Sequence, residues 1–141
     1  MLLGCSDDGA TLAPNVSAEQ QAVASRMMGL KFPPETRFLF YHRAKEDRDL
    51  LPAPDDSLHV KIELRGPALT TFLSQPPLNE ATWKSTAVLL GDTGRWKEWK
   101  PSGVQKFRSD KFEWPKSKFL HVLIDDDRED TKVVYLFWFE T

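Results

Sequence analysis

The segment from Ser57 to Arg65 places the strongest constraint on how this chain can fold. Its apolar residues are Leu58, Val60, Ile62 and Leu64, and they alternate with His59, Lys61, Glu63 and Arg65. A period of two puts the apolar set on one face of a β-strand and the polar set on the other. The sequence therefore predicts a strand with one buried face and one face in water. The buried face must be covered by another element of secondary structure.

Other segments predict further strands. The runs 119–124 and 132–139 are rich in β-branched and aromatic residues, and the acidic residues 125–130 between them are typical of a hairpin loop. The last run contains VVYLFWF and is apolar on both faces, which predicts a central strand. Residues 36–44 are predicted to form a strand and residues 83–90 another, whereas residues 95–116 have no clear period and are expected to be irregular.

Two helices are predicted. Ser17 and Gln20 have the spacing of a capping box, in which each side chain accepts from the other's backbone N–H. Apolar residues follow at helical spacing up to Gly29, which favours a helix over 18–28. A short helix is expected to begin at Gly66-Pro67 and to end before Pro76. This order of elements predicts an α+β domain, with a mainly antiparallel sheet of about four to five strands and two helices on one face.

Composition narrows the classes of partner. The chain has 141 residues, of which 40% are hydrophobic, so a single globular domain with its own core is expected. The formal net charge of -2 gives no general attraction to nucleic acid or anionic lipid, and no nucleic-acid partner is expected. No apolar run approaches the roughly 20 residues that a membrane-spanning helix needs.

The first residues carry a resemblance to a known class. Leu2-Leu3-Gly4-Cys5 resembles the lipobox of bacterial lipoproteins, in which the cysteine thiol receives a diacylglyceryl group. The resemblance covers about four positions. A secretory signal also needs a basic stretch and an apolar stretch of about 7–15 residues, and only Met1-Leu2-Leu3 precede Gly4 here. Residues 6–15 are small and polar without any period, so residues 1–16 are predicted to be a lipobox-like start and flexible tether, and residues 17–141 the single globular domain.

This resemblance implies a location. Cys5, the only cysteine, would be lipidated, and the protein would face the periplasm with an N-terminal lipid as its sole contact with the membrane. The residue that follows the cysteine is Ser6, and a serine at this position resembles the pattern of lipoproteins that are sent to the outer membrane. The alternative is a cytoplasmic protein in which Cys5 is an inert thiol.

The sequence contains only a partial match to a known catalytic motif. Asp92-Thr93-Gly94 resembles the triplet of aspartic proteases, but that chemistry needs two aspartates that share a proton, and Arg95 follows where a small residue is usual. A turn rich in glycine and aspartate explains the triplet equally simply. No nucleophile elbow, phosphate-binding loop or dinucleotide fingerprint occurs.

Metal-binding patterns are also incomplete. His42, His59 and His121 lie on three predicted strands without ligand-like spacing. Asp125, Asp127 and Glu129 alternate as calcium ligands do, but the glycine and the glutamate of a calcium loop are missing at the sixth and twelfth positions. The sequence therefore predicts no metal and no cofactor.

The segment 95–118 interleaves aromatic residues with cations. The candidate partner-binding residues are Arg95, Trp96, Lys97, Trp99 and Lys100. Two interpretations stay open. The indoles could anchor a partner at the surface, with the cations as a rim, or they could hold an irregular segment onto the sheet while the lysines are simply solvated. A long segment without secondary structure is uncommon in a compact domain unless it binds something.

These observations favour a non-catalytic lipoprotein of the cell envelope that acts as a binding module. Its partner would be a protein or a cell-wall polymer, with acidic character, and the oligomeric state is left open. Small periplasmic lipoproteins that neutralise toxins delivered by competing bacteria are similar in general build, so an immunity-type inhibitor is one form of this hypothesis. The alternative is a hydrolase or metal-dependent enzyme whose site is not visible in the sequence.

Overall fold

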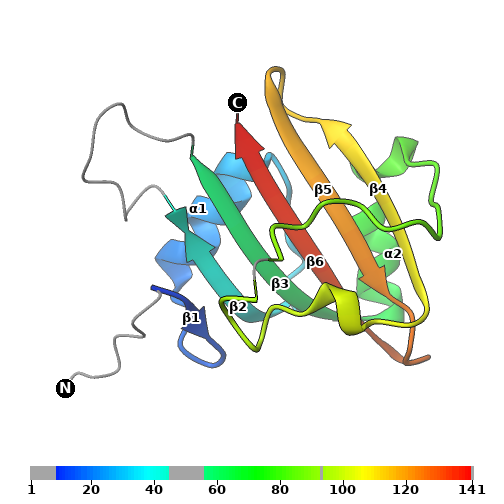
Figure 1. The fold of residues 1–141 in the computed structure, drawn as a ribbon, viewed down its shortest axis with the longest axis horizontal. Helices are drawn as coiled ribbons and strands as arrows, with labels where there is room; N and C mark the ends of the chain where they lie inside the picture. Colours follow the sequence, from blue (N-terminus) through cyan, green and yellow to red (C-terminus); the bar gives the residue numbers. More distant parts are fainter. Residues whose placement is uncertain (1–8, 45–55, 93, 141) are drawn as a thin grey trace.

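A computed structural model describes residues 9–44, 56–92 and 94–140. The fold is α+β, with two α-helices against one face of a six-stranded antiparallel sheet, one strand more than the upper number expected (Figure 1). The strand order is β1-β2-β3-β6-β5-β4. The strands are β1 (Thr11–Leu12), β2 (Arg37–Arg43), β3 (Ser57–Arg65), β4 (Phe107–Glu113), β5 (Lys118–Asp125) and β6 (Thr131–Glu140).

Helix α1 (Ala18–Met28) has the predicted bounds and the predicted cap. The Ser17 hydroxyl accepts from the Gln20 backbone N–H at 3.0 Å, and the Gln20 side chain accepts from the Ser17 N–H at 3.0 Å. The helix ends at Gly29, whose φ of 64° lies in the left-handed region that favours glycine. The capping box therefore forms as the sequence indicated.

Helix α2 (Gly66–Leu73) begins with Pro67 in its first turn, also as predicted. Both helices pack on the same face of the sheet, which we call the helix-covered face. The predicted alternation in β3 is confirmed there, because Leu58, Val60, Ile62 and Leu64 are all buried in this core. Neither helix of the described ranges is long and apolar enough to span a membrane.

Strand β6 is central, as its apolar faces indicated, and pairs with β3 on one side and β5 on the other. Its residues contribute to both faces of the sheet: Leu136 lies in the helix-covered core and Phe137 in a second cluster on the opposite face. A strand buried on both faces needs apolar residues at every position, which explains the run VVYLFWF.

Strand β4, one of two strands that were not predicted, comes from a segment expected to be irregular. Residues 107–113 form β4 at the sheet edge, with a sequence, FRSDKFE, in which charges hide the alternation. Those charges pair across the edge: Arg108 donates to Asp126 at 2.7 and 2.9 Å, and Lys84 to Asp110 at 3.1 Å. The Lys111 N–H is satisfied by the Asp110 carboxylate at 2.8 Å, which helps to protect an edge that could otherwise pair with another chain.

Two other expectations are corrected. Residues 83–90 do not form a strand and make only an isolated bridge between Lys84 and Ser109. Residues 11–12, expected in the tether, form β1 instead and pair with Tyr41 and Phe40 of β2. A two-residue strand is too short to leave a periodic signal. Cys5 and the rest of the lipobox-like start lie outside the described residues.

The second face of β3 is only partly in water: Arg65 is exposed, Lys61 and Glu63 are half-buried, and His59 is buried. His59 is only 7% exposed, because residues 84–104 cross this face and cover it (Figure 1). We call residues 84–104, described except for residue 93, the strap, and the face beneath it the strap-covered face. The alternation predicted the strand correctly, but it could not reveal that an irregular segment covers the polar side.

Candidate functional site

The two candidate tryptophans lie in the core of the strap-covered face. Trp96 is 5% exposed and Trp99 only 1%. The Trp99 ring packs against Tyr135 and His59 at centroid distances of 5.0 and 4.9 Å, and Trp96 against Phe40 at 5.3 Å. The indoles therefore hold the strap onto the sheet, as the second interpretation had it, and their faces are not available as surface anchors in this structure.

The candidate cations do face solvent. Arg95, Lys97 and Lys100 are exposed, and the Arg95 guanidinium lies 4.9 Å from the centroid of the Trp96 ring. The ammonium groups of Lys97 and Lys100 form no ion pair with any other described residue. By contrast, Arg108 and Lys118 form ion pairs with the acidic side chains of Asp126 and Glu140 of the same chain. Burial thus divides the predicted site into buried indoles and exposed cations.

The three histidines lie in one row across the sheet. His42 pairs with His59 across β2 and β3, His59 with Phe137, and Phe137 with His121 across β6 and β5. This is the strap-covered face. Among the described residues, no three His, Cys, Asp or Glu side chains converge as metal ligands do.

Two of these histidines bind the strap, together with Trp99. The backbone carbonyls of Leu89, Leu90 and Gly91 are consecutive, and each accepts from a different side chain. The donors are His121 Nδ1 at 2.6 Å, Trp99 Nε1 at 2.8 Å and His59 Nε2 at 3.3 Å, in that order. Side chains thus supply the hydrogen bonds that a neighbouring strand would otherwise give this backbone.

Gly91 is required at the end of this carbonyl triplet. Its φ is 62°, in the left-handed region, and a Cβ on it would collide with the His59 ring and crowd Phe137. The close approach lets the Gly91 carbonyl reach His59. The local reason for the irregular backbone is therefore a glycine turn held by aromatic and imidazole donors.

Burial sets the charge state of the two histidines. It lowers the pKa of His59 from its ordinary value of 6.5 to about 4, with the nearby His42 and Arg95 acting in the same direction and the Gly91 hydrogen bond against them. Burial also lowers the pKa of His121, again against the effect of its carbonyl partner, Leu89. Both rings are therefore neutral near pH 7, with the proton on Nε2 of His59 and on Nδ1 of His121.

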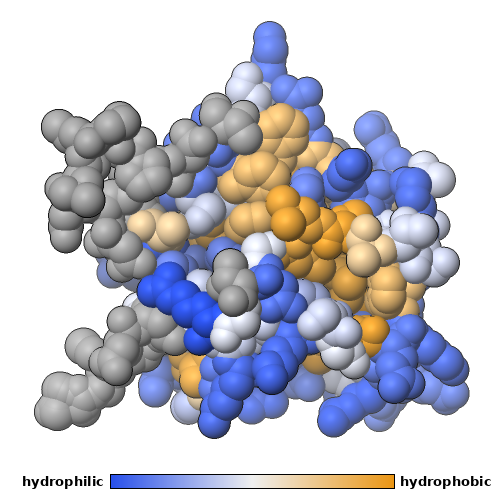
Figure 2. Space-filling model, in the orientation of Figure 1, coloured by the Kyte–Doolittle hydropathy of each residue, from blue (hydrophilic) through white to orange (hydrophobic). Residues whose placement is uncertain are grey.

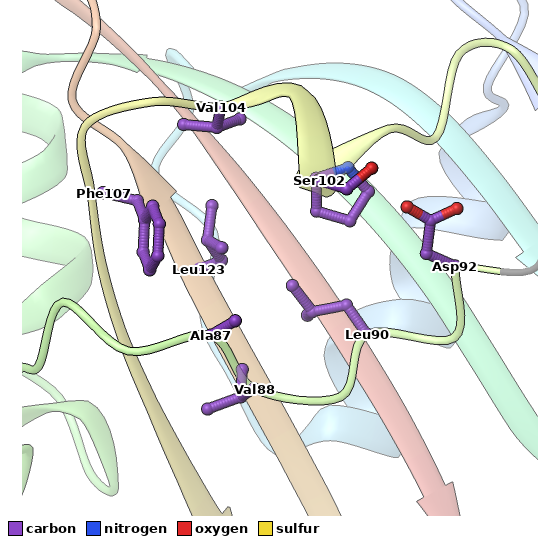
Figure 3. Close-up of a pocket in the computed structure, with 9 residues that line it drawn as sticks. Ala87, Val88, Leu90, Asp92, Ser102, Val104, Phe107 and Leu123 are labelled. Atoms are coloured by element: carbon purple, nitrogen blue, oxygen red, sulfur yellow. The ribbon is translucent and has the colours of Figure 1, made fainter.

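The carbonyl triplet supports one wall of an apolar cleft. The cleft has a volume of about 290 Å³ and is lined by Ala87, Val88, Leu90, Asp92, Pro101, Ser102, Val104, Phe107 and Leu123 (Figure 3). The strap supplies its walls, and Phe107 of β4 and Leu123 of β5 come from the sheet. Asp92 and Ser102 lie toward one end of the cleft, away from Phe107 (Figure 3).

An exposed apolar surface adjoins the cleft. Leu89, between Val88 and Leu90 in the strap, is 64% exposed and is the one large hydrophobic residue of the described chain in that state. Figure 2 shows a hydrophobic area in the middle of this face, with hydrophilic side chains around it. An apolar centre within a polar rim is the usual anatomy of a binding surface.

Little in the sequence indicates the cleft. Its strap residues Ala87, Val88 and Leu90 belong to the apolar run that predicted a strand, and Val104 and Phe107 lie in a segment without a period. One signal for the cleft was available: the apolar run that ends at Leu90 is followed directly by the turn residues 91–94, and the tryptophan-rich stretch comes next. An apolar run that stops at a glycine turn is compatible with a pinned loop as well as with a strand.

Comparison of the chain with protein-family models, with curated proteins and with solved structures finds no match. The class of protein must therefore be inferred from the cleft and its surroundings. These provide apolar walls, two oxygen-bearing side chains at one end and a group of exposed cations that is close in sequence to the lining residues.

Proposed function

We propose that this protein is a non-catalytic binding module of the cell envelope and that its partner is an acidic protein. The partner binds the strap-covered face. The observation that carries this proposal is the apolar cleft with exposed Leu89 beside it, close in sequence to the exposed cations Arg95, Lys97 and Lys100. Protein interfaces combine such an apolar centre with a charged rim.

A protein partner is favoured over an anionic cell-wall polymer. A polyanion would engage the lysines but has no use for apolar walls lined by Val88, Leu123 and Phe107. A folded protein can present an apolar side chain and acidic neighbours on one surface, so it uses both features. An immunity-type inhibitor, which acts by binding a toxin tightly, is one form of this function.

The location is proposed from the lipobox-like start. Cys5 would carry the lipid, and the domain would face the periplasm from the outer membrane, with a cytoplasmic location as the alternative. Cells expressing the native gene, with any coding sequence upstream of Met1 included, and cells expressing its Cys5→Ser variant would be fractionated. We expect the wild-type protein with membranes and the variant in the soluble fraction. A wild-type protein recovered in the cytosol with a free thiol would contradict this location.

The partner is tested by charge reversal. Lys97→Glu combined with Lys100→Glu should weaken binding of the partner at least tenfold at low salt, since rim charges steer association and repel when reversed. The wild-type affinity should also fall as salt is raised, because the Debye length is about 8 Å at physiological ionic strength. The partner is first captured from envelope extract on the immobilised full chain, then purified and titrated.

The matched control reverses two exposed lysines away from the strap, Lys31→Glu with Lys116→Glu. It makes the same change in net charge and should leave the affinity within about twofold. Melting temperatures of both variants should match the wild type, since surface substitutions usually change stability by less than about 0.5 kcal/mol. Equal losses of affinity in the two variants would show a general charge effect and contradict this binding face.

A further inference from the structure

The cleft has room for one large side chain. Ligand pockets usually measure about 300–1,000 Å³, and this cleft, at about 290 Å³, lies at the lower limit of that range. A group the size of a nucleotide cofactor would not fit. An aromatic side chain is much smaller than such a cofactor and is of a suitable size. When bound, it buries about 150–250 Å² of surface.

The chemistry of the cleft is asymmetric. Phe107, Leu123 and Val88 make its body apolar, whereas Asp92 and Ser102 lie toward the other end (Figure 3). One Asp92 oxygen, Oδ1, accepts from the Gly94 N–H at 3.3 Å, which leaves Oδ2 as an acceptor, and the exposed Ser102 hydroxyl is a second one. An occupant that matches both ends has an apolar body and a hydrogen-bond donor at its edge.

The wall of the cleft is already organised. The carbonyls of residues 89–91 are held by His121, Trp99 and His59, so Val88 and Leu90 are positioned before anything binds. An occupant therefore does not need to order this loop, and the entropic penalty of binding is reduced.

We propose that the cleft receives a tryptophan or tyrosine side chain of the partner, whose indole N–H or phenol O–H donates to Asp92 or Ser102. This inference rests on the proposed function and specifies the anchor of that interface. Tryptophan and tyrosine dominate interface hot spots, and a rim of weaker contacts excludes water around them. Here the rim is exposed Leu89 together with the strap cations that attract the acidic partner.

A small-molecule probe tests the cleft without the partner. N-acetyl-tryptophanamide would be titrated into the full chain while the methyl resonances of Val88, Val104 and Leu123 are followed by NMR. We expect these methyls to shift at millimolar concentration. N-acetyl-phenylalaninamide, which lacks a side-chain donor, and N-acetyl-leucinamide should bind about five- to tenfold more weakly, the factor expected for one hydrogen bond. Equal or tighter binding of the leucine or phenylalanine probe, or of hexanoate, would overturn the proposal.

Two variants locate the bound ring. Ala87 lines the cleft (Figure 3), so Ala87→Trp should fill it, with loss of probe binding and at least tenfold weaker partner binding. Ser85→Trp is the control, because Ser85 is an exposed strap residue that does not line the cleft. Asp92→Ala combined with Ser102→Ala removes both acceptors and should remove the preference for tryptophan over phenylalanine, with a smaller change in binding of the leucine probe. This second variant keeps the test valid if Ala87→Trp fails to fold.

The outcomes separate this inference from the proposed function. If Ala87→Trp and Ser85→Trp bind the partner equally well while the Lys97 and Lys100 reversal weakens binding, the cationic rim is right and the aromatic anchor is wrong. If the tryptophan probe binds with the expected preference but charge reversal has no effect, the acidic protein partner is wrong. The same result would leave the cleft as an aromatic-binding site.

Discussion

The two faces of the sheet are covered in different ways. On the helix-covered face, α1 and α2 pack on aliphatic side chains such as Leu58 and Ile62, and each helix satisfies its own backbone hydrogen bonds. On the strap-covered face, an irregular segment lies on aromatic rings and imidazoles, and its carbonyls accept from side chains. A cover without secondary structure therefore depends on individual donors, whereas a helical cover depends on buried area.

This difference locates the part of the molecule that can be loosened by a single substitution. Three side chains from β3, β5 and the strap hold the carbonyls of residues 89–91, and Leu90, the middle one of these residues, lines the cleft. Loss of any one donor leaves a carbonyl without its partner next to the candidate binding site. Regions with few such bonds open most easily in native proteins.

The largest effect is expected at Trp99. Trp99→Ala should lower the free energy of unfolding by about 3–5 kcal/mol, because it removes a fully buried ring and the donor to the Leu90 carbonyl. Trp99→Phe keeps most of the ring volume and should cost less, mainly the unsatisfied carbonyl. Urea unfolding measures both, and broadening of the Val88 and Leu90 methyl resonances should show a more mobile strap in both variants.

The helix-covered face supplies the contrast. Ile62→Ala should cost about 2–5 kcal/mol through a cavity alone, since Ile62 is fully buried beneath the helices. Under native conditions it should not selectively broaden the methyl resonances of Val88 and Leu90. If both substitutions broaden the same resonances, the two covers unfold as one unit and the proposed difference between them is wrong.

The predictability of each face follows from the same difference. The helix-covered face could be predicted because its elements follow local sequence rules. These rules are the alternation of 57–65, the capping box at Ser17 and the proline in the first turn of α2. The α+β class and the central position of β6 followed from those rules. The strap-covered face has no such repeat, so its pairing and cover depend on contacts between distant residues.

Particular residues show where local rules fail. His59 occupies a position that alternation assigns to water, and it is buried only because Trp96 and Trp99 arrive from more than thirty residues away along the chain. In β4, pairing of Arg108 with Asp126 gives a charged edge strand that no periodicity marks. The exposed cations of the candidate site could be predicted from the sequence. The cleft could not, because it forms only when the strap folds onto the sheet.

A second, smaller effect distinguishes the two faces by pH. His59 is neutral in the fold because burial lowers its pKa to about 4, whereas an unfolded histidine has a pKa near 6.5. Between these values the unfolded chain binds a proton that the folded chain does not bind, so stability falls as the pH is lowered. His42 of β2 and Arg95 of the strap act in the same direction. His121, whose pKa is also lowered, adds to the loss.

We therefore expect the free energy of unfolding to decrease by up to about 3 kcal/mol between pH 6.5 and pH 4 on account of His59. Asp110 and Asp126 have lowered pKa values and affect stability at lower pH, outside this window. Urea unfolding at half-unit pH steps measures the slope.

His59→Gln should flatten the curve even though it lowers stability at pH 7, and His121→Gln should flatten it less. At pH 5 the Trp99 indole N–H, which donates to the Leu90 carbonyl, should exchange before the amides of either helix, because the titrating ring is bonded to the adjacent Gly91. An unchanged slope in His59→Gln would show that the acid sensitivity arises elsewhere, and earlier opening of the helices would place it on the other face of the sheet.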